Sequence, residues 1–224
     1  MGLKESGLRG SLRNVSVGIV AIPDSDIYLQ DDWGDGKFQD RDGSGTTTHN
    51  GVEGVYRPEW SVLAGSPEVI SERFVIESDE EVTADINLNF DETITWVWNA
   101  DFSNNGGGGI DLSNLHLFTE DPNNTTDRVY HASYALRCRT LQDDEDIIFN
   151  KVDESGSFSE FGRGGNLSGS HEIKVTRDPS GNFELTLDGS SITTGSDTEF
   201  TDPVAIGFTG REDSRVDVDE MKVS

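Results

Sequence analysis

Cysteine, basic residues and long apolar runs are all scarce in this sequence. Its one cysteine, Cys138, stands in the alternating stretch YHASYALRCR. A lone cysteine excludes an internal disulfide and a zinc site built on thiolates, and such a thiol is expected in the core. No apolar run could span a membrane, and VSVGIVAIP near the start is too short and interrupted for a signal peptide. We therefore expect no membrane insertion.

Basic residues are far outnumbered. The chain has 17 of them against 43 acidic residues among 224, which gives a formal net charge of −26. Such a chain lacks the basic footprint of nucleic-acid binding. Hydrophobic content is only 33%, but the apolar residues alternate regularly, which indicates folding and not disorder. Concentrated salt shortens the Debye length to about 3 Å at 1 M and screens self-repulsion, so the composition is typical of a halophile's protein.

No stretch has a convincing helical period, whereas two-residue alternation recurs from about residue 24 onward. VTADINLNF and TITWVWNAD alternate on either side of a short turn at Asp91–Glu92, and HEIKVTRD and NFELTLDG flank the turn sequence PSG. RVDVDEMKV changes phase part-way, which predicts a bulge. Segments 104–109, 119–127 and 159–170 are predicted loops. The pattern predicts two antiparallel sheets packed as a sandwich or jelly roll over residues 24–224.

Residues 1–23 differ from the rest in charge and texture. They carry three basic residues against one acidic residue and show no strand alternation. We interpret them as an N-terminal arm separate from the globular body. Because no local element would bury its apolar residues, the arm is expected to dock onto a partner. The candidate docking residues are Leu8, Arg9, Leu12 and Arg13.

Four stretches of the body carry a resemblance to a known family. DDWGDGKF, GSPEVISERFVI, HEIKVTRDPSGNFELTLDG and SRVDVDEMKV resemble strands of concanavalin A-like, laminin-G-like domains. The resemblance implies that the first and last strands lie side by side. It implies little about function, because this fold includes lectins, glycosidases, adhesion modules and plain structural domains.

The arm carries a second resemblance. MGLKESGLRGSLRNVSVGIVAIPDS is similar to the beginnings of many haloarchaeal virus and provirus proteins. This resemblance implies a tail-fibre or appendage protein on the virion surface, assembled in the host cytoplasm and used for host attachment. The implied partners are other virion proteins, sister subunits in a homo-oligomer, and a host glycan or glycoprotein. The alternatives are a capsid decoration or turret protein without a receptor role, and a secreted carbohydrate-active enzyme.

The acidic stretch after residue 31 invites a metal interpretation. A calcium loop starting at Asp40 would place Asp42 third and Gly51 twelfth, where a bidentate glutamate is required. The loop is therefore incomplete. Asp40 and Asp42 remain as candidate ligands of a structural divalent cation, and no other cofactor is expected.

The carboxylates and tryptophans include the candidates for catalysis and for glycan stacking. Glu77, Asp79 and Glu81 have the E-x-D-x-E spacing of laminarinase-type glycosidases, but the polar stretch around them predicts a turn, so we predict no catalytic residue. Trp96 and Trp98 share a face with Ile94 and are expected in the core. Trp33 and Trp60 lie in less regular segments and are the candidates for exposed glycan stacking.

The charge leads to a test by salt. We expect the unfolding temperature to rise markedly between about 0.1 and 2 M monovalent salt, because screening relieves the repulsion among carboxylates. Differential scanning calorimetry in KCl and NaCl would measure it. A flat response would remove the halophile interpretation, and a rise only with millimolar calcium would favour the cation site at Asp40 and Asp42.

Overall fold

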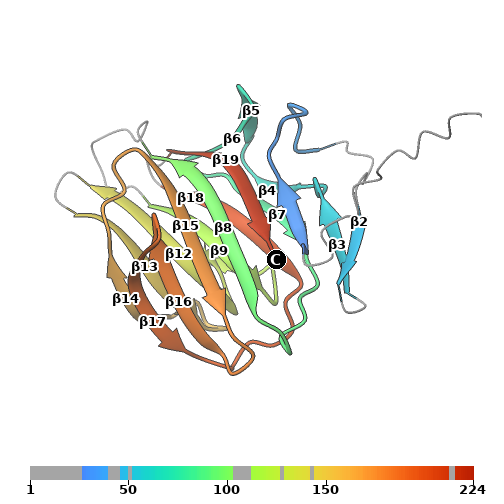
Figure 1. Ribbon diagram of the computed structural model, residues 1–224. Coiled ribbons are helices and arrows are strands. Elements are labelled where there is room, and N and C mark those ends of the chain that lie inside the picture. The colour runs from blue at the N-terminus through green and yellow to red at the C-terminus, as the bar shows by residue number, and fades with distance from the viewer. Residues whose placement is uncertain are drawn as a thin grey trace, which may run out of the picture.

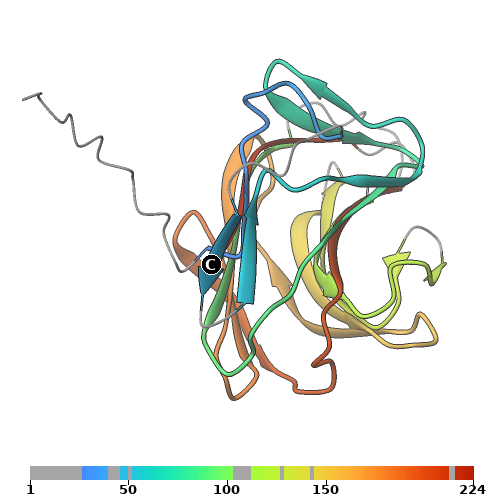
Figure 2. The ribbon, with the colours of Figure 1, turned by 90° about the vertical axis from the view of Figure 1, so that its right-hand side faces the viewer.

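The molecule is built of two β-sheets that lie face to face with the core between them (Figure 1; Figure 2). The computed structural model describes residues 27–39, 46–49, 52–102, 112–126, 129–141, 144–211 and 215–224. Within these ranges every regular element is a strand. The predicted all-β sandwich of two sheets is therefore confirmed. The predicted arm, including Leu8, Arg9, Leu12 and Arg13, lies outside the described residues.

The larger sheet has ten strands and holds the C-terminal strand near its middle. Its main path runs in the order β17 (Ser190–Ser196), β16 (Asn182–Leu187), β15 (Ser170–Arg177), β8 (Ile94–Asp101), β19 (Arg215–Val223), β1 (Leu29–Asp31), β3 (Val52–Tyr56) and β2 (Thr46–His49). Off this path, β6 (Arg73–Glu77) pairs with β19, and β5 (Glu68–Ile70) pairs with β6. The pairing of β1 with β3 is parallel, which is an exception to the predicted antiparallel order.

The second sheet has seven strands, and a two-stranded ribbon lies beside it. Its order is β14 (Phe158–Gly164), β13 (Asp144–Val152), β12 (Ser133–Leu141), β9 (Leu112–Thr119), β18 (Ala205–Arg211), β7 (Glu81–Asp85) and β4 (Ser61–Ala64). The ribbon consists of β10 (Thr125–Thr126) and β11 (Val129–Tyr130). Figure 2 shows the ribbon on the side of this sheet that faces away from the ten-stranded sheet.

Alternation along the strands places one apolar row of each sheet in the core. Trp96 and Trp98 of β8 are completely buried there, as predicted. Cys138 of β12 is also buried, and this burial raises the pKa of its thiol. The edges of the two sheets meet at β14 and β17, where Thr193 donates a hydrogen bond of 3.4 Å to the carbonyl of Phe161.

Three local predictions are confirmed by the strand pairing. The PSG turn joins β15 and β16 in an antiparallel hairpin. The register of β19 against β8 shifts between Val218 and Glu220, so the change of phase is a bulge at Asp219. The chain's first described strand pairs with its last, with Leu29 opposite Val223.

Two segments differ from the prediction. Residues 82–90 keep their apolar alternation, but the strand ends at Asp85, because the following residues cross from the seven-stranded sheet to β8 of the other sheet. The segment 159–170, predicted as a loop, begins with β14. Its glycines serve packing and not only turning, since a Cβ on Gly162 would lie 2.2 Å from the Thr193 hydroxyl.

The stretch DDWGDG ends β1 and forms a turn around a buried carboxylate. Asp31 is fully buried and accepts hydrogen bonds from the backbone N–H of Trp33 at 3.0 Å and the indole N–H of Trp60 at 2.9 Å. Asp32 and Asp35 accept bonds from backbone N–H groups two residues later, at 3.1 Å each. These aspartates therefore organise a strand end and a turn.

The assignment of Trp33 and Trp60 as exposed stacking residues is wrong. Both side chains are 0% exposed. Their rings pack on Phe74, with centroid distances of 5.3 Å for Trp33 and 5.8 Å for Trp60. Irregular backbone does not imply exposure here, because burial of two large aromatic surfaces outweighs the cost of the turn.

The two tryptophans provide a matched pair of substitutions. Trp60→Phe removes an indole N–H that satisfies Asp31, whereas the indole N–H of Trp33 has no hydrogen-bond partner among the described residues. Both substitutions remove similar ring volume. We expect Trp60→Phe to lower the free energy of unfolding by about 1–3 kcal/mol more than Trp33→Phe. Urea unfolding in concentrated salt would measure it, and equal losses would contradict a structural role for this hydrogen bond.

Candidate functional site

The residues proposed from the sequence do not form a site in the described part of the chain. Asp40 and Asp42 lie outside the described residues. Within the described ranges, no cluster of three or more histidine, cysteine or acidic side chains is placed to hold a metal ion. The same ranges contain no helix long and apolar enough to cross a membrane.

The E-x-D-x-E segment is a turn between the two sheets, as predicted. Glu77 ends β6 in the larger sheet, Asp79 has a positive φ of 63°, and Glu81 begins β7 in the smaller sheet. The intervening Glu80 accepts hydrogen bonds from the backbone N–H of Glu77 at 2.7 Å and of Ser66 at 3.3 Å. Burial raises the pKa of Glu80, and these bonds oppose the rise. The three carboxylates therefore do not alternate along one strand, as the glycosidase motif requires.

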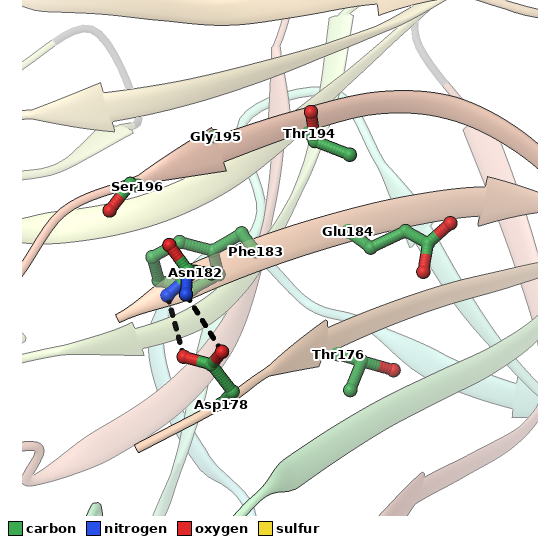
Figure 3. A pocket seen from close by; sticks show the side chains of 8 residues that line it. All are labelled: Thr176, Asp178, Asn182, Phe183, Glu184, Thr194, Gly195 and Ser196. Atoms are coloured by element: carbon green, nitrogen blue, oxygen red, sulfur yellow. Dashed lines mark hydrogen bonds between the residues drawn. The ribbon is translucent and has the colours of Figure 1, made fainter. Parts of the chain in front are cut away.

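A shallow groove of about 520 Å³ crosses β15, β16 and β17 on the outer face of the ten-stranded sheet (Figure 3). Thr176, Glu184 and Thr194 form one row across the three strands. Asp178 accepts bonds from the backbone N–H of Asn182 at 2.9 Å and from its side-chain amide at 2.8 Å. These bonds lower the pKa of Asp178. Its carboxylate closes the hairpin turn, so the groove offers hydroxyls and negative charge but no exposed aromatic ring.

The outer face of the seven-stranded sheet is the other candidate. From here on, "outer face" means only the side of the seven-stranded sheet whose side chains point away from the core. In its middle they form a buried polar network: Asn114 donates to the Thr209 hydroxyl at 3.0 Å, and His116 lies 3.4 Å from the same oxygen. Ser133 lies 3.5 Å from the other nitrogen of His116 and donates to the carbonyl of Tyr130 at 2.6 Å.

Tyr130 of the ribbon covers this network. Its hydroxyl donates to the carbonyl of Val82 at 3.1 Å, and its ring centroid lies 4.5 Å from that of His116. Gly207 makes the contact possible, because a Cβ at this position would lie 2.6 Å from the Tyr130 ring. Burial lowers the pKa of His116 to about 3, so the imidazole is neutral near pH 7. The middle of the outer face is therefore closed and structural.

The end of the outer face over β12, β13 and β14 is more open. Phe158 is 42% exposed there, and the guanidinium carbon of Arg137 lies 4.6 Å from its ring centroid, a cation–π distance. Arg163 donates to Glu160 at 2.9 Å and also lies 3.9 Å from Asp146. Burial lowers the pKa of Arg137, and the positive charges of Arg211, Arg139 and Arg163 lower it further.

The sequence interpretation missed this arrangement. Arg137, Arg139, Arg163 and Arg211 come from three strands and are joined only by the register of the sheet. One signal was available: the pair R-C-R places two arginines on one strand face beside a core cysteine, in a chain that has few basic residues.

Comparison with known proteins shows the fold. The carbohydrate recognition domain of Emp46p in a metal-free form has 12% identity and a TM-score of 0.57, with 73% of this chain and 87% of that chain covered. The binding domain of botulinum neurotoxin DC in complex with SialylT has 12% identity and a TM-score of 0.56, with 91% of this chain and 48% of that chain covered. The exoplasmic/lumenal domain of VIP36 in a Ca2+/Man3GlcNAc-bound form has 14% identity and a TM-score of 0.50, with 74% of this chain and 83% of that chain covered.

These likenesses confirm the predicted concanavalin A-like jelly roll as the fold of this chain. No protein-family model and no curated protein matches the sequence.

The buried histidine predicts a pH dependence of stability. The folded pKa of His116 is about 3 against an ordinary 6.5, so the unfolded chain takes up a proton that the folded chain refuses as pH falls below 6.5. Stability is therefore lost at about 1.4 kcal/mol per pH unit in this window. Between pH 6.5 and 5 the native chain should lose about 2 kcal/mol more than His116→Gln in chemical unfolding.

The control for this experiment is His171→Gln. The ring of His171 lies 2.8 Å from the carboxylate of Asp188 and 3.3 Å from the carbonyl oxygen of Ser168, and both contacts are exposed. Its removal should not flatten the profile in the same way. Parallel profiles for the native chain and His116→Gln would show that His116 is not held neutral.

Proposed function

We propose that this chain is a non-enzymatic, glycan-binding surface protein of a haloarchaeal virus, of the tail-fibre or appendage type, and that it attaches the particle to its host. The observation that carries the binding part is the exposed Phe158, held under the guanidinium of Arg137 on the outer face of the seven-stranded sheet. An accessible aromatic ring beside fixed polar groups is the arrangement that sugar recognition uses, since a sugar has an apolar face and polar edges.

The fold supports this proposal. Two of the similar structures are described as carbohydrate-bearing: the VIP36 domain with Man3GlcNAc and the neurotoxin binding domain with SialylT. Emp46p contributes a carbohydrate recognition domain. Because the fold also includes enzymes and structural domains, the assignment to this chain depends on its own side chains at β12 and β14.

The viral part of the proposal depends on residues 1–25, which resemble the beginnings of haloarchaeal virus proteins. The acidic composition agrees with an environment of concentrated salt. On this proposal the protein lies on the virion surface, in a homo-oligomer, with residues 1–23 against other virion proteins. A decoration or turret protein would share the arm and the location but would bind no glycan, and a secreted enzyme would cleave one.

Glycan binding is tested with Phe158→Ala and a control of equal exposure. Leu63 of β4 is 42% exposed, like Phe158, but lies at the opposite edge of the same sheet. The native chain should bind oligosaccharides from host-cell envelopes in about 2 M KCl, a concentration at which charge attraction is strongly screened. Phe158→Ala should weaken binding at least about tenfold, and Leu63→Ala should not. Calorimetric titration and a glycan array would measure it.

The same samples distinguish the alternatives. Absence of binding to every envelope glycan would favour the decoration or turret protein. Release of reducing ends from a host polysaccharide, abolished by Glu77→Gln, would establish the enzyme.

The arm is tested by deleting residues 1–22. We expect the truncated chain to keep its unfolding temperature and its glycan affinity and to lose incorporation into particles. The reason is that the docking residues Leu8, Arg9, Leu12 and Arg13 are removed while the sandwich is intact. Normal incorporation would contradict the docking proposal, and failure to fold would show that the arm belongs to the sandwich.

A further inference from the structure

Four arginines come together at the open end of the outer face. Arg137 lies opposite Ile148, which lies opposite Arg163 on the next strand. Arg139 lies opposite Leu112, which lies opposite Arg211. With strands about 4.8 Å apart and residues about 3.4 Å apart along a strand, each of the four arginine Cα atoms lies within about 10 Å of another.

Four of the chain's 17 basic residues lie on this part of the face, whereas the chain has 43 acidic residues. Two acidic residues lie among these arginines: Glu160 is bonded to Arg163, and Asp146 lies 3.9 Å from Arg163 and opposite Arg139 in the strand pairing. Arg139 and Arg211 have partners of their own within the chain. Carboxylates and arginines therefore share this part of the face, on a molecule of net charge −26.

The position of Arg137 suits it to bind an anion in concentrated salt. At a salt concentration of about 1 M the Debye length is about 3 Å, so the attraction between exposed charges is largely screened. Pairs that are partly buried are screened much less. Arg137 is half-buried, and its Nε is enclosed and has no hydrogen-bond partner among the described residues, so the terminal nitrogens of its guanidinium are the groups that a ligand would meet. The planar guanidinium can hold a carboxylate or sulfate through two parallel hydrogen bonds, which a lysine cannot do.

We infer that the outer face binds an anionic saccharide, whose carboxylate or sulfate group is held by Arg137 with Arg163 and whose ring packs on Phe158. This inference rests on the proposed glycan-binding function and names the class of glycan. Phe158 favours a saccharide over an acidic polypeptide, because it provides an apolar platform next to the cationic groups. The groove on the ten-stranded sheet has the opposite character, since Asp178 and Glu184 line it.

The experiment compares ligands that differ only in charge. The protein is titrated in 2 M KCl with tetragalacturonate and, separately, with its methyl ester. It is also titrated with a sulfated dextran oligosaccharide and with unsulfated dextran of the same length. The native chain should bind at least one charged form about tenfold or more tightly than its neutral counterpart. The pair that shows the difference identifies a carboxylate or a sulfate as the recognised group.

Three substitutions test the arginines. Arg137→Lys keeps the charge and loses the planar fork, so it should weaken binding of the charged ligand about tenfold more than binding of the neutral one. Glu160→Gln removes the carboxylate that Arg163 engages and should strengthen binding. Arg57→Gln is the control. Arg57 follows β3 of the ten-stranded sheet and lies 3.4 Å from Asp32, so it is not part of the outer face. Circular dichroism and unfolding midpoints establish that each variant is folded.

The outcomes separate this inference from the function on which it rests. Equal binding of charged and neutral forms, weakened by Phe158→Ala but not by Arg137→Lys, would overturn the anionic class and leave glycan binding intact. If polyglutamate bound as tightly as the charged saccharide, the inference that the ligand is a saccharide would be overturned. Absence of binding to any saccharide would overturn both proposals.

Discussion

The buried carboxylate of Asp31 is the constraint on which the first half of the fold depends. An ionised carboxylate without partners in the interior costs several kcal/mol, so the chain must bring donors to it. The donors come from Trp33, just after β1, and from Trp60, where the chain passes from the ten-stranded sheet to β4 of the other sheet. The same interaction therefore joins the two sheets on the side away from β14 and β17, and the aromatic contacts with Phe74 fill the space behind it.

The outer face of the seven-stranded sheet divides into two parts with different physical roles. Under Tyr130, the polar side chains bond to one another and are removed from solvent, so they stabilise the sheet and contribute no binding surface. Toward β14, the sheet ends without such a cover over Phe158, which is exposed, and Arg163 faces solvent with Glu160. The ribbon thus covers one part of the face and leaves the other part accessible to solvent.

The sequence predicts strands best where alternation and turn residues agree. The hairpin of β15 and β16 and the bulge in β19 follow from the local pattern alone. Residues 86–90 show why the same pattern can mislead: alternation indicates burial, and a segment that crosses between sheets can bury alternate side chains after its strand has ended. Trp33 and Trp60 failed for the converse reason, since their burial is decided by contacts with Phe74, far away in the sequence. The candidate site likewise depends on contacts between distant segments. Its arginines come together through the register between strands, which the sequence of a single strand does not determine.

On the proposed function the protein works in concentrated salt, and that medium would account for both the acidic composition and the arginines of the outer face. At a Debye length of about 3 Å, long-range attraction contributes little, so the negative charge of the whole molecule does not repel an anionic ligand at a distance. Recognition then depends on direct hydrogen bonds and on the apolar contact, both of which act within a few ångströms. A half-buried guanidinium next to an aromatic ring provides these two interactions together. At low salt the same molecule would repel the same ligand, because its net charge of −26 would act over a longer range. Affinity for an anionic ligand should therefore increase with salt until the screening of the rest of the surface is complete, which is opposite to the usual trend for a cationic site.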